Sequence, residues 1–161
     1  MLEEIKESIS GTICDIRLYK DDLLPLYKLY NIEGLLKDVS STNIWLKSGA
    51  YIVIEYTEAM TVIDVNSGKF IKGKDRNNTF LKVNIEAAHE IFAQLRLRNI
   101  SGIVMCDFIN MESEDDERVL MNEIKTLASK DRIPVNVLGF TRLKLLELTR
   151  KKLRDRVILK R

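Results

Sequence analysis

A chain of 161 residues, 45% of them hydrophobic, can bury the core of one domain, and it has no apolar run long enough to cross a membrane. The composition suits a globular protein, and the net charge of +2 identifies no class of partner. Cys14 and Cys106 show no metal-ligand spacing, and no secretory signal is visible. We therefore expect reduced, buried thiols in a cytoplasmic protein.

The beginning of the chain predicts a small piece that is separate from the rest. Residues 1–10 favour a short helix, and residues 11–19 alternate like a strand. Residues 21–39 carry a helix-like apolar stripe that a proline and a glycine weaken. The polar stretch SSTN, residues 40–43, is a natural joint. The predicted domains are 1–40 and 41–161.

The second domain begins with a predicted hairpin and the strongest predicted helix. Residues 51–66 (YIVIEYTEAMTVIDVN) predict two strands around a turn, which is the pattern of an antiparallel hairpin. Residues 77–99 place apolar side chains on one helical face, and Asn77 or Asn78 can cap that helix.

The pattern then alternates between strands and helices. Residues 102–109 (GIVMCDFI) predict an apolar strand, and Ser113 followed by Asp116 resembles the capping box of a new helix. Another strand is expected over residues 133–140, so this strand–helix–strand unit predicts a right-handed crossover.

The last predicted element is a basic helix over residues 142–156 (RLKLLELTRKKLRDR). Together, these elements predict an α/β fold: a mixed sheet with flanking helices.

Asp64 and Asp107 each end an apolar strand just before a break in the pattern. Side chains at strand ends are where ligands bind in such sheets, and these carboxylates converge if their strands are neighbours. Two like charges that lie close together favour a cation between them, and magnesium suits oxygen ligands. Asn66, on the same strand face as Asp64, can supply an amide oxygen or orient a water. The alternative is that both aspartates are strand-end caps or ion-pair partners.

Three other features have both a structural and a functional interpretation. His89 lies mid-helix among charged residues, where a solvated histidine is favoured over a catalytic one. The acidic run Glu112–Glu117 resembles metal ligands, but we favour its electrostatic role at a helix N-terminus. Trp45 and the tyrosines can stack on nucleic-acid bases, although packing in the core or at an edge is favoured.

The end of the chain is strongly basic. The segment Phe140–Arg161 holds nine basic residues against two acidic ones. Such a block is either a phosphate-binding surface or a solvated helix face, and charge alone does not decide between them.

Several blocks of the sequence, in this order, resemble the catalytic region of the ribonuclease E/G family. They are WLKSGAYIVIEYTEAMTVIDVNSGK, NIEAAHEIFAQLRLRNISGIVMCDFINM and RLKLLELTRKK, and the upstream IRLYKDDLLPLYKLYNIEGLL resembles the segment that leads into that region. The resemblance covers roughly residues 15–152, and the combination of blocks is specific where each alone is not.

The resemblance implies a magnesium-dependent endoribonuclease that hydrolyses single-stranded RNA in RNA processing and decay. It implies that the magnesium ligands are Asp64 and Asp107 and that the catalytic asparagine is Asn66. It also implies a phosphate-binding arginine at Arg142. With the neighbouring bases included, the residues expected to hold RNA are Arg142, Lys144, Arg150 and Lys151.

Residues 1–40 resemble a remnant of the family's RNase H-like subdomain, and residues 41–161 its DNase I-like catalytic subdomain. The second acid of the family's DFIDM motif is Asn110 here, so metal affinity is expected to differ. The family's OB-fold domain, its 5′-monophosphate pocket and the cysteine pair whose zinc links two subunits have no match. We expect an excised, weakly active catalytic fragment of a homo-oligomer, or else a naturally minimal protein. The alternative function is a non-catalytic RNA-binding module that uses the basic C-terminal segment.

Overall fold

The computed structural model describes residues 17–39, 41–68 and 76–153, and the chain divides into two compact units, Met1–Asp38 and Val39–Arg161. The division falls close to the predicted joint, while the subdomain identities of the two parts stay predictions. The described helices of the first unit are α2 (Leu26–Leu29) and α3 (Ile32–Val39), and the last residue of α3 is already counted in the second unit. They correspond to the predicted apolar stripe.

Two predictions for the start of the chain fall largely outside the described residues. The helix over residues 1–10 lies wholly outside them, and so does most of the strand over residues 11–19. The part of that strand that is described, residues 17–19, has no strand structure.

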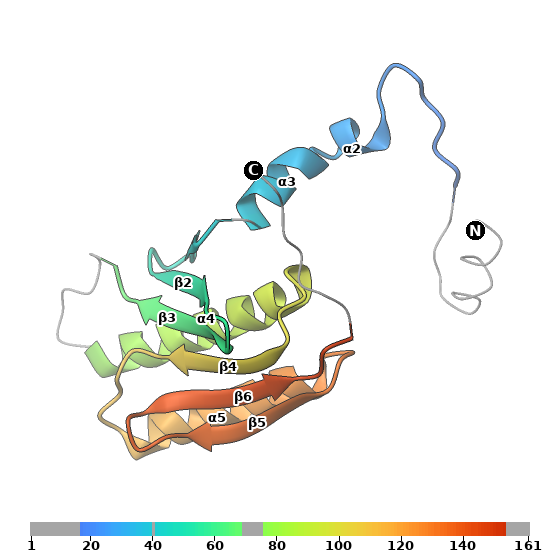
Figure 1. The fold of residues 1–161 in the computed structure, drawn as a ribbon. Helices are drawn as coiled ribbons and strands as arrows, with labels where there is room; N and C mark the ends of the chain where they lie inside the picture. Colours follow the sequence, from blue (N-terminus) through green and yellow to red (C-terminus); the bar gives the residue numbers. More distant parts are fainter. Residues whose placement is uncertain (1–16, 40, 69–75, 154–161) are drawn as a thin grey trace. The chain divides into compact units, whose positions relative to one another are not determined.

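In the described part of the second unit, six strands form one sheet in the order β1-β2-β3-β4-β6-β5 (Figure 1). The strands β3 and β4 are parallel, and every other neighbouring pair is antiparallel. The predicted mixed sheet and the predicted hairpin of β2 and β3 are therefore confirmed. The strands are β1 (Asn43–Trp45), β2 (Tyr51–Tyr56), β3 (Met60–Asn66), β4 (Gly102–Asp107), β5 (Val135–Phe140) and β6 (Leu145–Arg150).

Two long helices, α4 (Arg76–Leu97) and α5 (Glu114–Ser129), cover one face of this sheet (Figure 1). The core lies between them and the sheet, because alternate strand residues point toward the helices. The buried strand residues include Ile52, Ile54, Ile63, Val104, Leu146 and Leu148, and the buried α4 residues include Val83, Ala87, Ile91 and Leu95. The opposite face of the sheet carries the intervening side chains.

The two predicted helix caps had different outcomes. The Ser113 hydroxyl accepts a hydrogen bond from the Asp116 backbone N–H at 3.3 Å, which confirms the predicted N-cap of α5. The capping prediction for α4 was wrong, because the described part of that helix, Arg76–Leu97, already includes Asn77 and Asn78.

The predicted basic helix over residues 142–156 was also wrong in its described part, residues 142–153, whereas residues 154–156 lie outside the described residues. Its first part forms strand β6, which lies between β4 and β5. Leu146, Leu148 and Arg150 are buried and alternate with partly exposed neighbours, as in a strand. Leucine, lysine and glutamate favour a helix, but this preference is weak and tertiary packing overrides it.

The predicted strand–helix–strand unit is present as β4–α5–β5. Its two strands are parallel, since both are antiparallel to β6, and β6 lies between them. A second crossover, β3–α4–β4, joins two parallel strands that are neighbours. It brings the C-terminal ends of β3 and β4 to the same edge of the sheet. Among the described residues, no helix is long and apolar enough to cross a membrane.

Candidate active site

Asp64 and Asp107 lie side by side at the C-terminal ends of β3 and β4. They are register partners in the parallel pair, so their side chains leave the sheet on the same face, opposite α4 and α5. Asp107 is exposed, yet partial burial and then the charge of Asp64 raise the pKa of its carboxyl above the usual value. The predicted convergence of the two strand ends is therefore present in the fold.

Asn66 is held next to this carboxylate pair. Its side-chain Nδ2 donates a hydrogen bond to Oδ2 of Asp64 at 2.6 Å, which orients the amide. The chain then turns at Gly68, whose φ is +66°, and a Cβ there would lie 2.4 Å from the backbone oxygen of Gly49. Only glycine fits this close approach, so the turn after β3 is packed against the β1–β2 turn.

Asn84 of α4 holds the loop that follows Asp107. Its side chain is completely buried, donates to the backbone oxygen of Ile109 at 2.8 Å and accepts from the Ile109 N–H at 3.0 Å. This double hydrogen bond fixes the loop two residues after the carboxylate. Sequence reasoning missed this residue. The sequence pattern that could have identified Asn84 is a polar residue four and seven positions before Ala88 and Ile91, on the helix face that these apolar residues share.

The turn between β5 and β6 brings two basic residues to the same edge of the sheet. Leu145, the first residue of β6, is the register partner of Asp107, so Arg142 lies three residues from that position. Arg142 is exposed. Lys144 has a φ of +65°, a conformation that side chains seldom adopt, and its Nζ lies 2.7 Å from a carboxylate oxygen of Glu117. Lys144 and Asn110 line the same small depression beside this turn.

Comparison with known proteins shows the family of the chain. The model of the Ribonuclease E/G family matches residues 1–153. The chain belongs to this family. Ribonuclease G of Salmonella typhimurium (strain SL1344) is 41% identical over 133 residues, which is 83% of this chain and 27% of that protein.

Two further relatives match as well. Ribonuclease E of Nostoc sp. (strain PCC 7120) is 41% identical over 131 residues, 81% of this chain and 19% of that protein. The chloroplastic Ribonuclease E/G-like protein of Arabidopsis thaliana is 37% identical over 153 residues, 94% of this chain and 15% of that protein. The chain thus spans about a quarter, or less, of the length of these relatives.

Arg150 and Lys151 lie away from the candidate site of this family member. Arg150 pairs with Gly102 at the other end of β4, five strand residues or roughly 17 Å from the Asp107 position. Its side chain is 2% exposed, forms an ion pair with Asp131 and donates to the backbone oxygen of Ile100. This guanidinium is therefore a core ion-pair partner and not part of a surface that RNA can reach. Lys151 is exposed at that same distant end.

Three other features of the sequence have structural roles: His89, the acidic run and Cys106. His89 Nε2 lies 2.9 Å from a carboxylate oxygen of Glu123 on the helix side of the sheet, away from Asp64. The acidic run lies at the start of α5, as its helix-terminal interpretation predicted. Cys106 is a buried thiol, and burial raises its pKa to about 12, while Cys14 lies outside the described residues.

The donor set of the candidate site fits a hard divalent cation. Two neighbouring carboxylates and an amide are oxygen donors, and magnesium commonly uses one or two carboxylates together with waters and phosphate oxygens. Across residues 17–39, 41–68 and 76–153, no group of three or more His, Cys, Asp or Glu side chains is placed to hold a metal. An all-protein metal cage is therefore not found in that part of the chain, and the oxygen donors there are the neighbouring carboxylates of Asp64 and Asp107 with the Asn66 amide.

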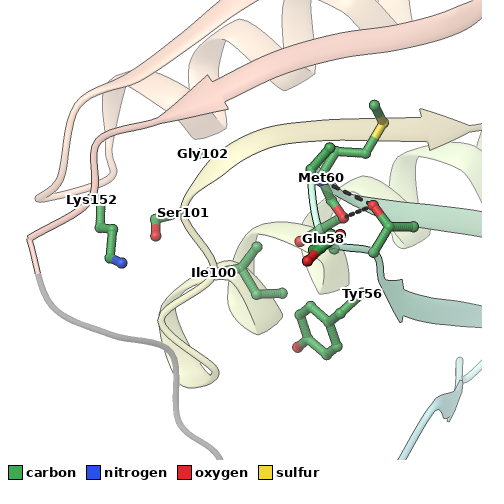
Figure 2. Close-up of a pocket in the computed structure, with 10 residues that line it drawn as sticks. Tyr56, Glu58, Met60, Ile100, Ser101, Gly102 and Lys152 are labelled. Atoms are coloured by element: carbon green, nitrogen blue, oxygen red, sulfur yellow. Dashed lines mark hydrogen bonds between the residues drawn. The ribbon is translucent and has the colours of Figure 1, made fainter.

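A larger cavity of about 560 Å³ lies at the opposite edge of the sheet. Its lining includes the β2–β3 turn and the start of β4, with Lys152 on one side and Glu58 and Tyr56 on the other (Figure 2). Met60 lines this cavity and is four strand residues, or roughly 13 Å, from Asp64. The cavity is therefore separate from the carboxylate pair.

Proposed function

We propose that this chain is the catalytic part of a magnesium-dependent endoribonuclease that hydrolyses phosphodiester bonds in single-stranded RNA. Family membership supports the reaction class. The observation that carries the proposal is the register pairing of Asp64 with Asp107, because it places two carboxylates together where the fold exposes them. Two uncompensated carboxylates in contact are unfavourable, and a bound cation removes that cost.

Asp64 and Asp107 would hold the magnesium ion. When bound, such an ion supplies positive charge to phosphate oxygens and lowers the pKa of water. Partial burial and then the charge of Asp64 raise the pKa of Asp107, and a bound cation would favour the charged form of this carboxyl. The two carboxylates would thus hold the cation at the ends of β3 and β4, where an RNA phosphate can approach it.

Asn66 positions the reacting groups. One of its N–H groups is oriented by Asp64, and an amide carries a second N–H and a carbonyl oxygen that can bind a phosphate oxygen or a water. Because the glycine turn fixes the end of β3, the amide is held in place before substrate arrives.

Arg142 holds the RNA backbone. Its exposed guanidinium lies in the β5–β6 turn at the carboxylate edge and can form paired hydrogen bonds with a phosphate. It offsets the negative charge that gathers around the phosphorus in the transition state. No histidine has a role in this mechanism, and His89 lies on the helix side.

Cleavage of a labelled single-stranded RNA tests the proposal. The chain should cleave it with magnesium and not with EDTA, and Asp64→Asn or Asp107→Asn should reduce the rate by at least about 100-fold. Glu55→Gln is the matched control, because Glu55 is an exposed acid on the same sheet face, outside the pair. RNA binding with no cleavage under any condition would favour the non-catalytic RNA-binding module. Equal cleavage by Asp64→Asn would overturn the assigned site.

A further inference from the structure

The only tryptophan of the chain, Trp45, is mostly exposed. Trp45 is 71% accessible to solvent, although it lies on strand β1 of the sheet. Its ring centroid lies 5.1 Å from that of Tyr51, and the two ring planes are tilted by 50°. The two rings therefore form an open aromatic surface, whereas tryptophan is highly buried on average in globular proteins.

This aromatic pair and Asn66 of the candidate active site form one row across strands β1, β2 and β3. Trp45 is the register partner of Tyr51, and Tyr51 is the register partner of Asn66. Register partners in antiparallel strands share a sheet face, so all three side chains are on the face that carries Asp64. Trp45 is two strand spacings, or roughly 10 Å, from Asn66.

The backbone that carries Trp45 is held firmly. The turn after β1 closes with a hydrogen bond from the Leu46 N–H to the Ala50 oxygen at 2.8 Å. The Glu86 carboxylate of α4 accepts from the Lys47 N–H at 2.7 Å and from the Ser48 N–H at 3.3 Å. The aromatic pair is thus presented by an ordered turn, which lowers the entropy lost when a ligand stacks on it.

We propose that Trp45 and Tyr51 form a stacking site for a nucleobase of the single-stranded RNA, close to the phosphate that reaches Asp64 and Asp107. This proposal rests on the proposed function and adds a source of strand selectivity to it. Aromatic side chains stack on any base that is free of its neighbours, so the site is tolerant of sequence. A base inside a duplex is already stacked and cannot lie on these rings.

The stacking site contributes an apolar part to RNA affinity. Phosphate contacts release counterions and weaken steeply with salt, whereas stacking on a neutral ring does not. Removal of Trp45 is therefore expected to lower affinity at every salt concentration by the same factor. Removal of a phosphate-binding cation is expected to change the salt dependence itself. This difference separates the two kinds of contact.

The fluorescence of Trp45 reports directly on the site, because no other tryptophan contributes. The 161-residue chain, without divalent cations so that RNA stays intact, is titrated with a single-stranded oligoribonucleotide. A matched oligonucleotide with abasic positions and a blunt RNA duplex serve as ligand controls. The variants are Trp45→Ala, Tyr51→Ala and, as an aromatic control at the other end of β2, Tyr56→Ala.

We expect acrylamide to quench free Trp45 efficiently, and the single strand to quench or shift its emission more than the abasic strand or the duplex. Affinity, measured by anisotropy of a labelled RNA, should fall about tenfold in Trp45→Ala with an unchanged salt slope. Tyr51→Ala should also weaken binding, and Tyr56→Ala should bind like the parent chain.

Two results would overturn the stacking site. One is a Trp45 that acrylamide cannot reach in the free chain, which would mean that other protein covers it. The other is equal fluorescence response and equal affinity for normal and abasic strands. The same chain is assayed in parallel for magnesium-dependent cleavage and for its loss in Asp64→Asn. Retained cleavage with no stacking signal rejects the stacking site alone, whereas cleavage that is unaffected by Asp64→Asn rejects the proposed function.

Discussion

Asp64 and Asp107 occupy the same register position on two neighbouring parallel strands, so the fold holds two carboxylates together on one open sheet face. Asn66 donates a hydrogen bond to Asp64 on this face, and Asn84 of α4 anchors the loop after Asp107 from the helix side. The arrangement therefore cannot relax easily by moving one strand. Repulsion between the two carboxylates is built into the fold, and it makes a testable link between stability and function.

We predict that Asp107→Asn stabilises the cation-free chain while it abolishes cleavage. The change removes one of the two like charges, and because the pair is exposed and screened the gain in Tm should be small, up to about 3 °C. Thermal unfolding in EDTA at neutral pH measures it. Glu55→Gln, the acid outside the pair, should leave Tm unchanged.

The same pair predicts a dependence on pH. The pKa of Asp107 is raised above its usual 3.8, so the folded chain binds this proton more tightly than the unfolded chain does. Above the raised pKa Asp107 is charged, and the cost of its partial burial and its repulsion by Asp64 are both complete. As the pH falls through that pKa toward 3.8, Asp107 takes up its proton and both costs are relieved. The Tm difference between the parent chain and Asp107→Asn should therefore shrink in that range. A difference that grows there would contradict the coupling.

We predict that Arg150 stabilises the fold and does not bind RNA. Its side chain and that of Asp131 are 2% and 0% exposed, and removal of one partner leaves a buried charge, at a cost of about 3–5 kcal/mol. Arg150→Ala should lower Tm by roughly 6–20 °C. Its RNA affinity, measured well below the new Tm, should equal that of the parent chain. The neighbouring Lys151→Ala is the control and should leave Tm unchanged, because Lys151 is exposed.

The Arg150–Asp131 pair also has a pH dependence. Burial of Asp131 acts to raise its pKa, but the hydrogen bond from Arg150, the Ile133 N–H and nearby positive charge together lower it. A carboxyl with a lowered folded pKa adds stability above its unfolded pKa, and that stability is lost as the pH falls through the folded value. The stability of Asp131→Asn does not depend on this carboxyl. After correction for the lower starting Tm of Asp131→Asn, acid unfolding should therefore begin at a higher pH in the parent chain than in this variant.

We predict that Asn84→Ala weakens magnesium binding more than an ordinary surface change does. Loss of the side chain leaves the N–H and the oxygen of Ile109 without these partners, which costs about 1–3 kcal/mol for each group that stays buried. The loop after Asp107 should then move, and the magnesium-induced rise in Tm should become smaller at the same magnesium concentration. Asn122→Ala, at an exposed position of α5, is the matched control. An unchanged magnesium response in Asn84→Ala would show that the loop is held by other contacts.

Local patterns predicted much of the fold. The hairpin of β2 and β3, the strand that ends at Asp107 and the Ser113 cap all follow from features within a few residues of one another. The prediction for residues 142–156 failed because the decisive feature is not local. Strand β6 lies between β4 and β5, and it exists because Leu146 and Leu148 pack into the core from that central position.

In the candidate site, too, local sequence patterns predicted some residues and long-range strand pairing decided the others. Asp64, Asn66 and Asp107 could be selected from the sequence because each lies at the end of an apolar run. The pairing of β3 with β4 then brings them together. The basic residues could not be sorted by charge alone, since Arg142 and Arg150 look alike in sequence. Once β6 is a strand, one lies in the turn at the carboxylate edge and the other is buried at the far end.

Arg142 should account for part of the salt dependence of RNA binding. For single strands, the slope of log affinity against log salt is about −0.7 for each phosphate that is neutralised. Because Arg142 is exposed at the carboxylate edge, Arg142→Ala should make the slope less steep by about 0.7 and should also slow cleavage. Arg132→Ala is the matched control. It removes an exposed arginine that precedes β5, at the end of that strand opposite the Arg142 turn.

Lys144 provides an internal comparison for the same measurement. It lies in the same turn, but its ammonium group is already in an ion pair with Glu117, so Lys144→Ala should change the salt slope less than Arg142→Ala does. Glu117→Gln should release that ammonium group and make the slope steeper than in the parent chain. If Arg142→Ala and Arg132→Ala give equal slopes and equal cleavage rates, the turn between β5 and β6 does not contact the phosphate backbone, and the RNA path must leave the carboxylate pair in another direction.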